Sequence, residues 1–355
     1  MYNSKTNFTH VPKADMIDTY KVYPFWRSRI SDVDEMLDSA RRGKTGILCT
    51  SAGGRTIRTI SYGEKPDLCR RANYVSACGA KDTRFYADRE GKSPVIMLIG
   101  ATHGQETEGV AALMNLISLL ETGKDLRGVA IPSITEAYTR TAPRLVIIPI
   151  YNIDGRARCV PDSMIGEPHS GLRYHGQGTW KDGTLCGWPE CKSVHPIRDA
   201  VDHLGAYYND DGVNLMADNF FAPMAEETRA LLKLCDEEAP ECVIGLHGGE
   251  NTTNEFLHTD YVSKRAREGL VRLARDVAYR QRARGLQTRV HSVPAEPDAP
   301  PAFNLSSALH HVSGAVSSTY ESNEGLAEKY ALSAEEILLH HYCLFESLFR
   351  LAWRE

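Results

Sequence analysis

The stretch from Val95 to Glu106 reads Val-Ile-Met-Leu-Ile-Gly-Ala-Thr-His-Gly-Gln-Glu, and no other part of the chain says as much about the fold. Its apolar run over 95–100 predicts a buried strand, and a helical pattern opens at Thr107. The parallel strands of an open sheet present ligand-binding residues at their carboxyl ends. His103 and Glu106 lie at such an end, and an imidazole and a carboxylate both suit Zn²⁺. The stretch therefore predicts a strand that carries part of a metal site.

A second apolar run ends in the same way. Residues 242–249 read Cys-Val-Ile-Gly-Leu-His-Gly-Gly, so a strand over 243–246 would deliver His247 to a turn that the glycines permit. A catalytic zinc site has three protein ligands and leaves one position for water. We therefore predict a zinc site made by His103, Glu106 and His247.

Two cysteines and a histidine in the middle of the chain offer an alternative zinc site. Cys186, Cys191 and His195 are spaced as in a structural zinc cluster. A structural site needs four protein ligands, and the sequence shows no clear fourth ligand here. The site at the strand ends is therefore the stronger prediction.

Water activated by a metal also needs a general base that is not itself a ligand. Glu321 lies at the end of a β-prone run from Ala315 to Tyr320 and precedes a loop, which suits that role. Glu324 is its nearby competitor. A glutamate in a polar loop is usually only solvated, so the assignment of Glu321 depends on the predicted zinc site beside it.

Six fragments, in this order along the chain, resemble the zinc metallocarboxypeptidase family, whose superfamily includes aspartoacylase-like deacylases. They are Ser51-Ala-Gly-Gly-Arg-Thr-Ile57, the His103 and Glu106 pair, Ile148-Pro-Ile-Tyr-Asn-Ile-Asp-Gly155, Gly212-Val-Asn-Leu215, His247 in the place of the third zinc ligand, and Thr319-Tyr-Glu321. Each fragment is weak alone, but together they extend over most of the chain in the family's order.

The resemblance implies a fold, a cofactor and a reaction. The fold would be a single α/β/α domain over 46–355 of the zinc carboxypeptidase-like, phosphorylase/hydrolase-like class, with a mixed, mostly parallel central sheet of eight strands. Residues 1–45 would be an N-terminal extension packed on this domain, and 333–352 the family's C-terminal helix. The cofactor would be Zn²⁺ on the three predicted ligands. Glu321 would be the catalytic base for hydrolysis of an amide bond by activated water.

The chain departs from the family where carboxypeptidases recognise their substrate. The family's Asn-Arg pair grips the substrate's terminal carboxylate, whereas this chain has Met216 and Ala217, which cannot make that charge-assisted contact. The family's Asp that orients a zinc-binding histidine aligns with Asn214, so this histidine would lose an anionic partner. These departures predict zinc chemistry without ordinary recognition of a C-terminus.

The segment 156–211 is the least regular part of the sequence and is too long for a simple connection. The family places an arginine that polarises the carbonyl in this region. Arg156, Arg158 and Arg173 are the choices, and Arg173 is favoured, although an arginine in a loop is commonly only solvated. For substrate binding we predict Arg173, Arg156 and Asn214.

Strand-like and helix-like patterns alternate, which is typical of an α/β fold with a largely parallel sheet. The predicted strands cover 55–62, 95–100, 145–150, 243–246 and 315–320. The helix that opens at Thr107 has apolar residues at the spacing that packs against a sheet, and further helices are predicted over 226–238 and 262–284.

The composition argues against several classes of function. Of 355 residues, 42% are hydrophobic and 25% are charged, as in an ordinary soluble globular protein. A formal net charge of -5 and a pI near 6.2 argue against a nucleic-acid partner. No apolar stretch approaches the ~20 residues of a spanning helix, and the N-terminus lacks a signal-peptide pattern, so we expect no membrane association and a cytoplasmic location. The nine scattered cysteines fit reduced thiols in that compartment.

Three functions are compatible with these residues. The first is a zinc-dependent hydrolase that cleaves a peptide or N-acyl amide bond without being a standard C-terminal carboxypeptidase. The second is an aspartoacylase-like deacylase of small N-acyl amino acids, which differs in substrate size rather than in mechanism. The third is a catalytically silent binding protein on the same fold, and retention of all ligands and the base argues against it. The expected partner is a peptide or N-acyl amino-acid substrate, and the oligomeric state stays open.

Overall fold

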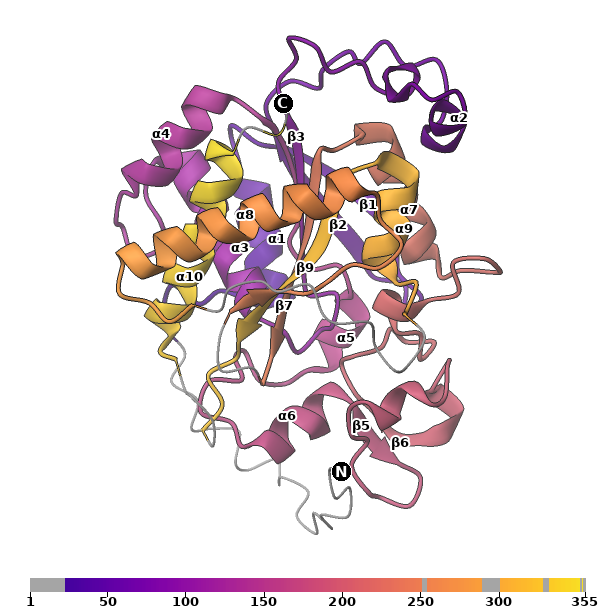
Figure 1. The fold of residues 1–355 in the computed structure, drawn as a ribbon. Helices are drawn as coiled ribbons and strands as arrows, with labels where there is room; N and C mark the ends of the chain where they lie inside the picture. The colour runs from indigo at the N-terminus through magenta and orange to yellow at the C-terminus, as the bar shows by residue number, and fades with distance from the viewer. Residues whose placement is uncertain (1–22, 251–253, 289–300, 328–331, 352, 354–355) are drawn as a thin grey trace.

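The structure, a computed structural model, describes residues 23–250, 254–288, 301–327, 332–351 and 353. Its centre is a seven-stranded sheet in the order β1-β2-β4-β3-β7-β9-β8 (Figure 1). In that order the strands are β1 (Lys44–Thr50), β2 (Thr56–Tyr62), β4 (Arg144–Ile148), β3 (Val95–Gly100), β7 (Cys242–Gly249), β9 (Val316–Asn323) and β8 (Glu255–Phe256). Among the described residues, the central sheet thus has one strand fewer than the resemblance implied.

The four central strands β4, β3, β7 and β9 are parallel to one another, and the outer strands pair antiparallel. The predicted mixed, mostly parallel sheet is therefore confirmed. Because the carboxyl ends of parallel strands lie at one edge of a sheet, the residues that end β3, β7 and β9 come together there. In the register of β7 and β9, His247 lies opposite Glu321.

Helices cover both faces of the sheet, which confirms the predicted α/β/α layers. On one side α10 contacts α3, α4 and α8, and on the other side α7 contacts α9 (Figure 1). The bounds are α3 (Glu108–Thr122), α4 (Pro132–Thr141), α7 (Glu226–Glu238), α8 (Lys264–Ala283), α9 (Leu305–Ser313) and α10 (Ala334–Arg350). Within the described ranges, no helix combines the length and the apolar character needed to cross a membrane.

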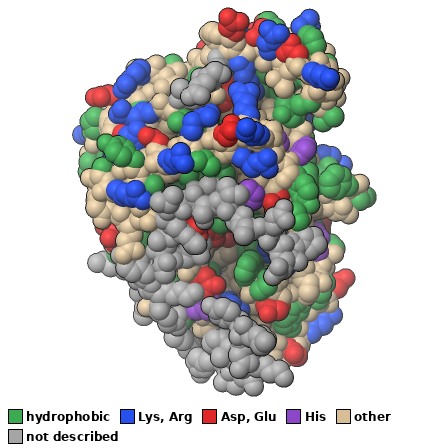
Figure 2. Space-filling model, in the orientation of Figure 1, with side chains coloured by type: hydrophobic (Ala, Val, Ile, Leu, Met, Phe, Trp, Pro, Cys, Tyr) green, Lys and Arg blue, Asp and Glu red, His purple; other side chains and the backbone are tan. Residues whose placement is uncertain are grey.

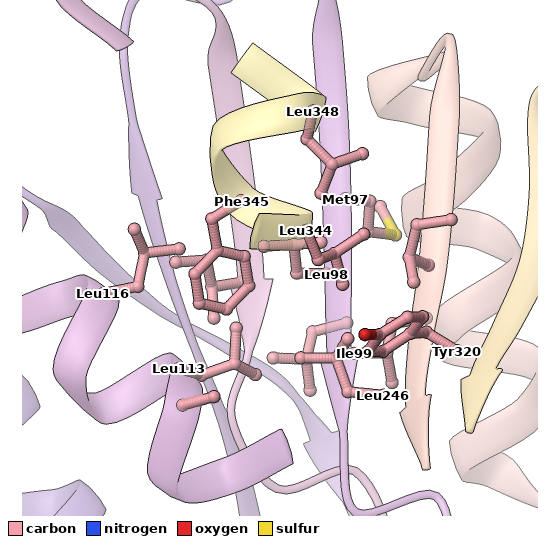
Figure 3. Packing of buried hydrophobic residues seen from close by; sticks show 14 of the residues in the cluster. Met97, Leu98, Ile99, Leu113, Leu116, Leu246, Tyr320, Leu344, Phe345 and Leu348 are labelled. Carbon is pink, nitrogen blue, oxygen red and sulfur yellow. The ribbon is translucent and has the colours of Figure 1, made fainter. Parts of the chain in front are cut away.

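The core between these layers holds the strand and helix that carry the first predicted ligands. All residues of β3 are buried and apolar, as expected for a strand covered on both faces. Leu98 and its neighbours on β3 pack with Leu113 of α3 and Phe345 of α10 (Figure 3). Truncation of a side chain such as Leu98 to alanine would cost about 2–5 kcal/mol. Packing therefore holds the turn between β3 and α3 in place.

The predicted elements are present, with shifted ends. β4 stops at Ile148, because Pro149 has no N–H for the ladder. β9 continues to Asn323, so Glu321 lies within a strand and not before a loop as we expected. α7 has the predicted bounds, whereas α8 begins at Lys264 rather than at 262.

The segment 156–211 folds into a small unit of its own. With the end of α5 (Ile153–Arg158) it contains α6 (His169–Gly176) and a two-stranded sheet of β5 (Gly178–Trp180) and β6 (Val201–Leu204). A separate apolar cluster holds the unit together, made of Cys186, Cys191, Ile197, Val201, Tyr207 and Tyr208. The irregular sequence thus hides short elements around a second core.

The described part of the N-terminal extension packs on the domain. Phe25, Trp26 and the helix α1 (Ile30–Ser39) contribute to the main core. The indole N–H of Trp26 also donates to the carbonyl of Asp162 at 3.0 Å. The boundary at residue 45 stays a prediction.

Candidate metal centre and active site

Three buried side chains converge at the carboxyl edge of the sheet, and their ligand atoms all lie within 4.8 Å of one another. They are His103 and Glu106 from the turn after β3, and His247 from the last part of β7. The Glu106 carboxylate lies between the imidazoles, with Oε1 2.6 Å from Nδ1 of His103 and Oε2 2.9 Å from Nδ1 of His247. The structure therefore brings together the three predicted ligands.

These donor atoms fit zinc. Two imidazole nitrogens and a carboxylate are a ligand set of catalytic zinc sites. Burial lowers the pKa of His103, which keeps this imidazole neutral, as a metal ligand must be. Burial alone would raise the pKa of Glu106, but the two imidazoles outweigh it and hold that pKa below its usual range. A divalent cation would stabilise this buried, ionised carboxylate.

Gly104 allows the metal-binding turn to approach its neighbours closely. Its N–H donates to the carbonyl of Ala206 at 2.7 Å. A Cβ at this position would lie 2.2 Å from the backbone nitrogen of Arg156, and the φ of Gly104 is not in the left-handed region. The glycine is therefore needed for space and not for an unusual backbone conformation.

Besides its contact with the Glu106 carboxylate, His103 is held by an aromatic ring. Its ring stacks on Tyr207, with centroids 3.5 Å apart and planes inclined by 11°. Its Nε2 atom has no hydrogen-bond partner among the described residues. The side chain of Asn214 accepts a hydrogen bond from the N–H of Met216 at 2.9 Å, which fixes a local turn. The predicted role of Asn214 in substrate binding stays a prediction.

Glu321 lies beside the three ligands. It is paired with His247 across β7 and β9, and a Cβ at Gly249 would lie 2.4 Å from its Oε1 atom. Burial raises the pKa of Glu321 to about 8, and the charge of Glu106 contributes to the rise. A carboxyl group with a pKa near neutrality, outside the ligand set, has the properties of a proton shuttle.

Two further carboxyl groups are buried next to the metal site. Glu108 begins α3 and Glu324 follows β9; each is 1% exposed, and their oxygens have no hydrogen-bond partner among the described residues. A Cβ at Gly248 would lie 2.4 Å from Oε2 of Glu108 and 3.1 Å from Oε1 of Glu324. Burial raises the pKa of Glu108 to about 8 and the pKa of Glu324 well above its ordinary value. Glu324, the alternative to Glu321 as general base, is thus one of two neighbouring carboxyl groups that burial keeps protonated.

The sequence did not point to Glu108 as part of this site. A glutamate in the first turn of a helix is an ordinary favourable partner of the helix dipole. The only available signal was its position two residues after Glu106, at the start of an apolar helical pattern. Only the pairing of distant strands shows that its carboxyl is buried.

The guanidinium of Arg156 forms hydrogen bonds with backbone carbonyls. It donates to the carbonyls of Ser28, Cys159 and Pro161 at 3.0, 3.2 and 2.9 Å. The residue is buried, and these contacts join the N-terminal extension to α5. They do not favour the predicted role of Arg156 in substrate binding.

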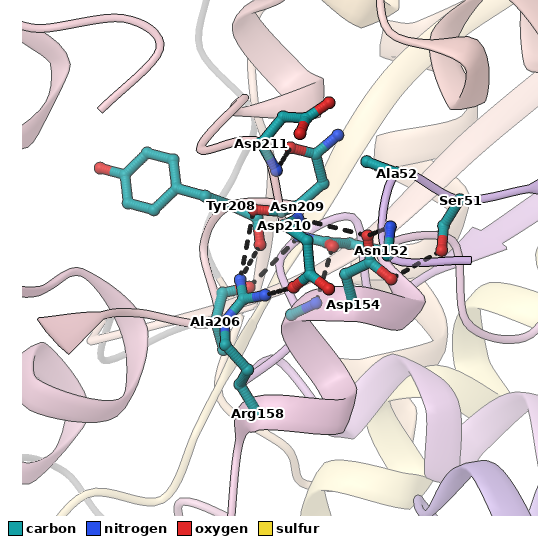
Figure 4. Close-up of polar contacts among 12 residues, drawn as sticks. Ser51, Ala52, Asn152, Asp154, Arg158, Ala206, Tyr208, Asn209, Asp210 and Asp211 are labelled. Carbon is teal, nitrogen blue, oxygen red and sulfur yellow. Dashed lines mark hydrogen bonds and ion pairs between the residues drawn. The ribbon is translucent and has the colours of Figure 1, made fainter. Parts of the chain in front are cut away.

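Arg158, the last residue of α5, belongs to an ion-pair network (Figure 4). It pairs with Asp210 and donates to the carbonyl of Tyr208. Arg55 joins the same network, 2.7 Å from Asp210 and 2.8 Å from the buried carboxylate of Asp154. These charges are balanced within the fold, so Arg158 has a structural role.

Of the three predicted arginines, Arg173 is linked through His169 to the residue that follows β7. Its Nε atom donates to Nε2 of His169 at 3.4 Å, and His169 is paired with Glu250, which follows β7. The side chain is half-buried on α6. Its role in substrate binding stays a prediction.

Lys192 is a cation near the site that sequence reasoning missed. The carbonyl of the preceding residue, Cys191, accepts a hydrogen bond from the hydroxyl of Tyr208 at 3.2 Å. Burial and the charge of Glu106 raise the pKa of Glu321. The positive charge of Lys192 acts in the opposite direction and lowers this pKa. A lysine in an irregular, polar segment gives no local signal that would distinguish it from a solvated one.

The alternative zinc site is not formed. Cys186 and Cys191 lie in the small apolar core, and within the described ranges the only converging metal-ligand group is the one at the strand ends. Nε2 of His195 instead accepts a hydrogen bond from the N–H of Asn214 at 3.2 Å. Burial raises the pKa of Cys186 to about 12, so this thiol stays protonated. The spacing was misleading because both cysteines pack as small apolar side chains.

The fold and the His-Glu-His group define a class of zinc-dependent hydrolases. A model of the zinc carboxypeptidase family matches residues 41–337. The chain therefore belongs to the zinc carboxypeptidase family, as the resemblance indicated. No curated protein matches the chain in sequence.

Solved structures with this fold share little sequence with the chain. A candidate carboxypeptidase A from Shewanella denitrificans aligns with a TM-score of 0.59 at 12% identity, over 91% of this chain and 69% of that one. A metallo-carboxypeptidase from Pseudomonas aeruginosa, solved with (2-guanidinoethylmercapto)succinic acid, gives 0.56 at 14%, over 91% and 68%. Carboxypeptidase A from Helicoverpa armigera gives 0.52 at 14%, over 91% and 72%. At this identity the likeness shows the fold alone.

Proposed function

We propose that this protein is a zinc-dependent hydrolase that cleaves a peptide or N-acyl amide bond with activated water. The observation that carries the proposal is the convergence of three ligands beside Glu321, whose backbone is in register with His247. Membership of the zinc carboxypeptidase family supports metal-dependent hydrolysis. A silent binding protein would not need a glutamate beside the three ligands.

When held by the three ligands, Zn²⁺ supplies Lewis acidity: it polarises the scissile carbonyl and lowers the pKa of a water molecule. Glu321 accepts a proton from the attacking water, because its carboxylate lies beside the ligands without being one of them. The same carboxyl group then donates the proton to the leaving nitrogen. Burial raises the pKa of this group to about 8, and a cation on the neighbouring ligands would lower it again, which favours the carboxylate that the first transfer needs.

Positive charge for the carbonyl oxygen comes, in this proposal, from the segment 156–211. Lys192 is exposed, with its ammonium 5.2 Å from the centroid of the Trp188 ring, and its positive charge acts on the pKa of His103, His247 and Glu321. A cation that reaches the carbonyl oxygen stabilises the transition state more than the ground state. Arg173 is the second candidate for this role.

Substrate recognition departs, we propose, from that of ordinary carboxypeptidases. Ala217 is exposed, Met216 packs against the core, and neither side chain has a donor for a carboxylate. The segment 156–211 reaches the site through Tyr207, which stacks on His103. The group that flanks the scissile amide therefore meets this segment, and a free α-carboxylate is not required.

A comparison of matched substrates tests this function. The zinc-loaded protein is given one peptide series with free and with amidated C-termini, together with small N-acyl amino acids. We expect zinc-dependent cleavage that is no weaker for the amidated peptides, and cleavage of the N-acyl amino acids alone would identify the deacylase. Strong dependence on a free α-carboxylate would refute the substrate proposal. Absence of any cleavage by protein with full zinc content would favour the silent binding protein.

A further inference from the structure

The outer face of α8 forms one wall of a basic groove that includes none of the proposed metal ligands. The groove has a volume of about 510 Å³, and His258, which follows the edge strand β8, lines its other side. The α8 residues that line it are Lys264, Arg267, Glu268, Val271, Arg272 and Arg275. Lys and Arg side chains gather over α8 in the space-filling view (Figure 2).

The lining residues of α8 form one continuous stripe. They recur at intervals of three and four, which places them on one side of the helix. From Lys264 to Arg275 the helix rises by about 17 Å. The positive charges are thus spread along a line and not gathered around a point.

The arginines of this stripe lack acidic partners. Among the residues that the structure describes, Arg267, Arg272 and Arg275 form no ion pair, and Nε of Arg272 is buried without a hydrogen-bond partner. Lys264 has only a distant contact, 3.8 Å from Glu268.

The other end of the same helix is different. Arg280 and Arg284 each lie 2.6 Å from an oxygen of the buried Glu346. α8 therefore carries two sets of arginines, one neutralised inside the fold and one unpaired around the groove. Like charges three residues apart, such as Arg272 and Arg275, destabilise a helix, and an anionic ligand would relieve this repulsion. The chain as a whole has a net charge of -5, so this local excess of positive charge does not follow from composition.

We propose that this groove binds an extended, acidic peptide segment. Guanidinium groups bind carboxylates through paired, charge-assisted hydrogen bonds, and a row of them along about 17 Å matches a strand of about five residues. The apolar side chain of Val271 and the stems of the arginines give the peptide backbone a surface to lie on. A compact anion would engage only part of the row. The binding does not depend on the hydrolytic activity.

The test measures fluorescence anisotropy of a labelled hexaglutamate peptide with the full-length, zinc-loaded chain. The chain carries Glu321→Gln so that the probe stays intact. We expect saturable binding that weakens as salt rises, because salt screens exposed charges. Hexaglutamine should not bind. Binding of hexaglutamine with equal strength, or no binding of hexaglutamate, would overturn the proposal.

Matched charge variants locate the binding. Arg267→Glu with Arg275→Glu should weaken hexaglutamate binding by about tenfold or more, since each exposed pair contributes a small factor and the substitutions add repulsion. Arg140→Glu with Arg282→Glu changes the net charge equally at exposed positions outside the groove, and should change binding by less than about twofold. Equal losses in both double variants would show a net-charge effect and overturn the proposal.

Tight binding of tripolyphosphate without binding of hexaglutamate would overturn the peptide proposal and identify a phosphate site instead. Thermal unfolding of each variant checks that the fold is intact.

Discussion

At the carboxyl edge of the sheet, the proposed metal ligands lie in the turn after β3 and in the last part of β7, two largely buried strands packed against α3. Across the site, the segment 156–217 is held by a small core of its own and by ion pairs such as that of Arg158 with Asp210. The sheet edge brings together His103, Glu106 and His247, the proposed ligands, with Glu321, the proposed base, beside them. The segment contains Met216 and Ala217 in place of the family's carboxylate grip.

This difference teaches that the chemistry and the specificity of the site rest on separate structural supports. The strands and α3 determine where the ligands lie, and a change there would disturb the main core. The segment 156–217 meets the metal-binding turn through Tyr207, which stacks on His103, and through the carbonyl of Ala206, which accepts from the N–H of Gly104. Its positions away from these two contacts can therefore change without displacing the ligands. The predictions below test this division.

The largest effect is expected from loss of a metal ligand. His247→Ala should reduce bound zinc to a small fraction of one per chain and abolish hydrolysis, because two ligands hold zinc poorly. Elemental analysis and an activity assay measure both, and His258→Ala, outside the site, should leave both unchanged. Full zinc content in His247→Ala would remove this residue from the metal site.

Substitution of the two glutamates near the end of β9 should have very different effects on the rate of hydrolysis. Glu321→Gln should lower the rate by roughly two to four orders of magnitude while zinc stays bound, because the proton shuttle is lost. Glu324→Gln is the matched variant, and it should keep most of the activity, because its carboxyl faces Glu108. A larger loss of rate in Glu324→Gln would reverse the assignment of the base.

The metal-binding edge should tolerate no added volume. Gly248→Ala places a Cβ 2.4 Å from Oε2 of Glu108, and should lower the free energy of unfolding by about 3 kcal/mol through overpacking. Gly79→Ala is the control, because nothing lies within 4 Å of its Cβ position. Denaturant unfolding measures both, and similar stabilities would show that this edge is less tightly packed than the structure indicates.

Acid should lower the free energy of unfolding through protonation of His175, which lies in the segment 156–211. Burial lowers the pKa of this histidine to about 4, below the 6.5 of an exposed histidine. The unfolded chain therefore binds a proton that the folded chain does not, and stability falls as the pH drops from 6.5 towards 4. At pH 5 the loss is about 2 kcal/mol. His175→Leu should make the decline of unfolding free energy over this pH range shallower, and an unchanged slope would contradict the assignment.

The smallest effect concerns specificity. Met216→Asn with Ala217→Arg restores the residue types of the family's carboxylate grip. Because the segment is not otherwise built for this contact, we expect the preference for free over amidated C-termini to rise only by about fivefold, less than a well-placed charged hydrogen bond gives. Ratios of kcat/KM measure this preference. No rise at all would show that the rest of the segment excludes a substrate carboxylate.

The sequence by itself predicted the fold class, which is confirmed, and singled out three residues as metal ligands that the fold brings together. The strand around Leu98 and the turn with His103 and Glu106 were recognisable because apolar periodicity and short ligand spacing are properties of neighbouring residues. The order of the fragments then pointed to the family. The ends of β9 and the elements inside 156–211 were not predictable in the same way, because polar and mixed runs become strands or turns only through the partners that cover them.

Only the tertiary structure decided the surroundings of these residues. It showed that Glu108 and Glu324 share one buried place, that Tyr207 stacks on His103, and that Arg156 is occupied by backbone carbonyls. The physical reason is that burial and charge pairing depend on which distant segments meet. A glutamate or arginine has the same local pattern whether it is solvated, paired or buried, and the topology of the sheet selects among these states.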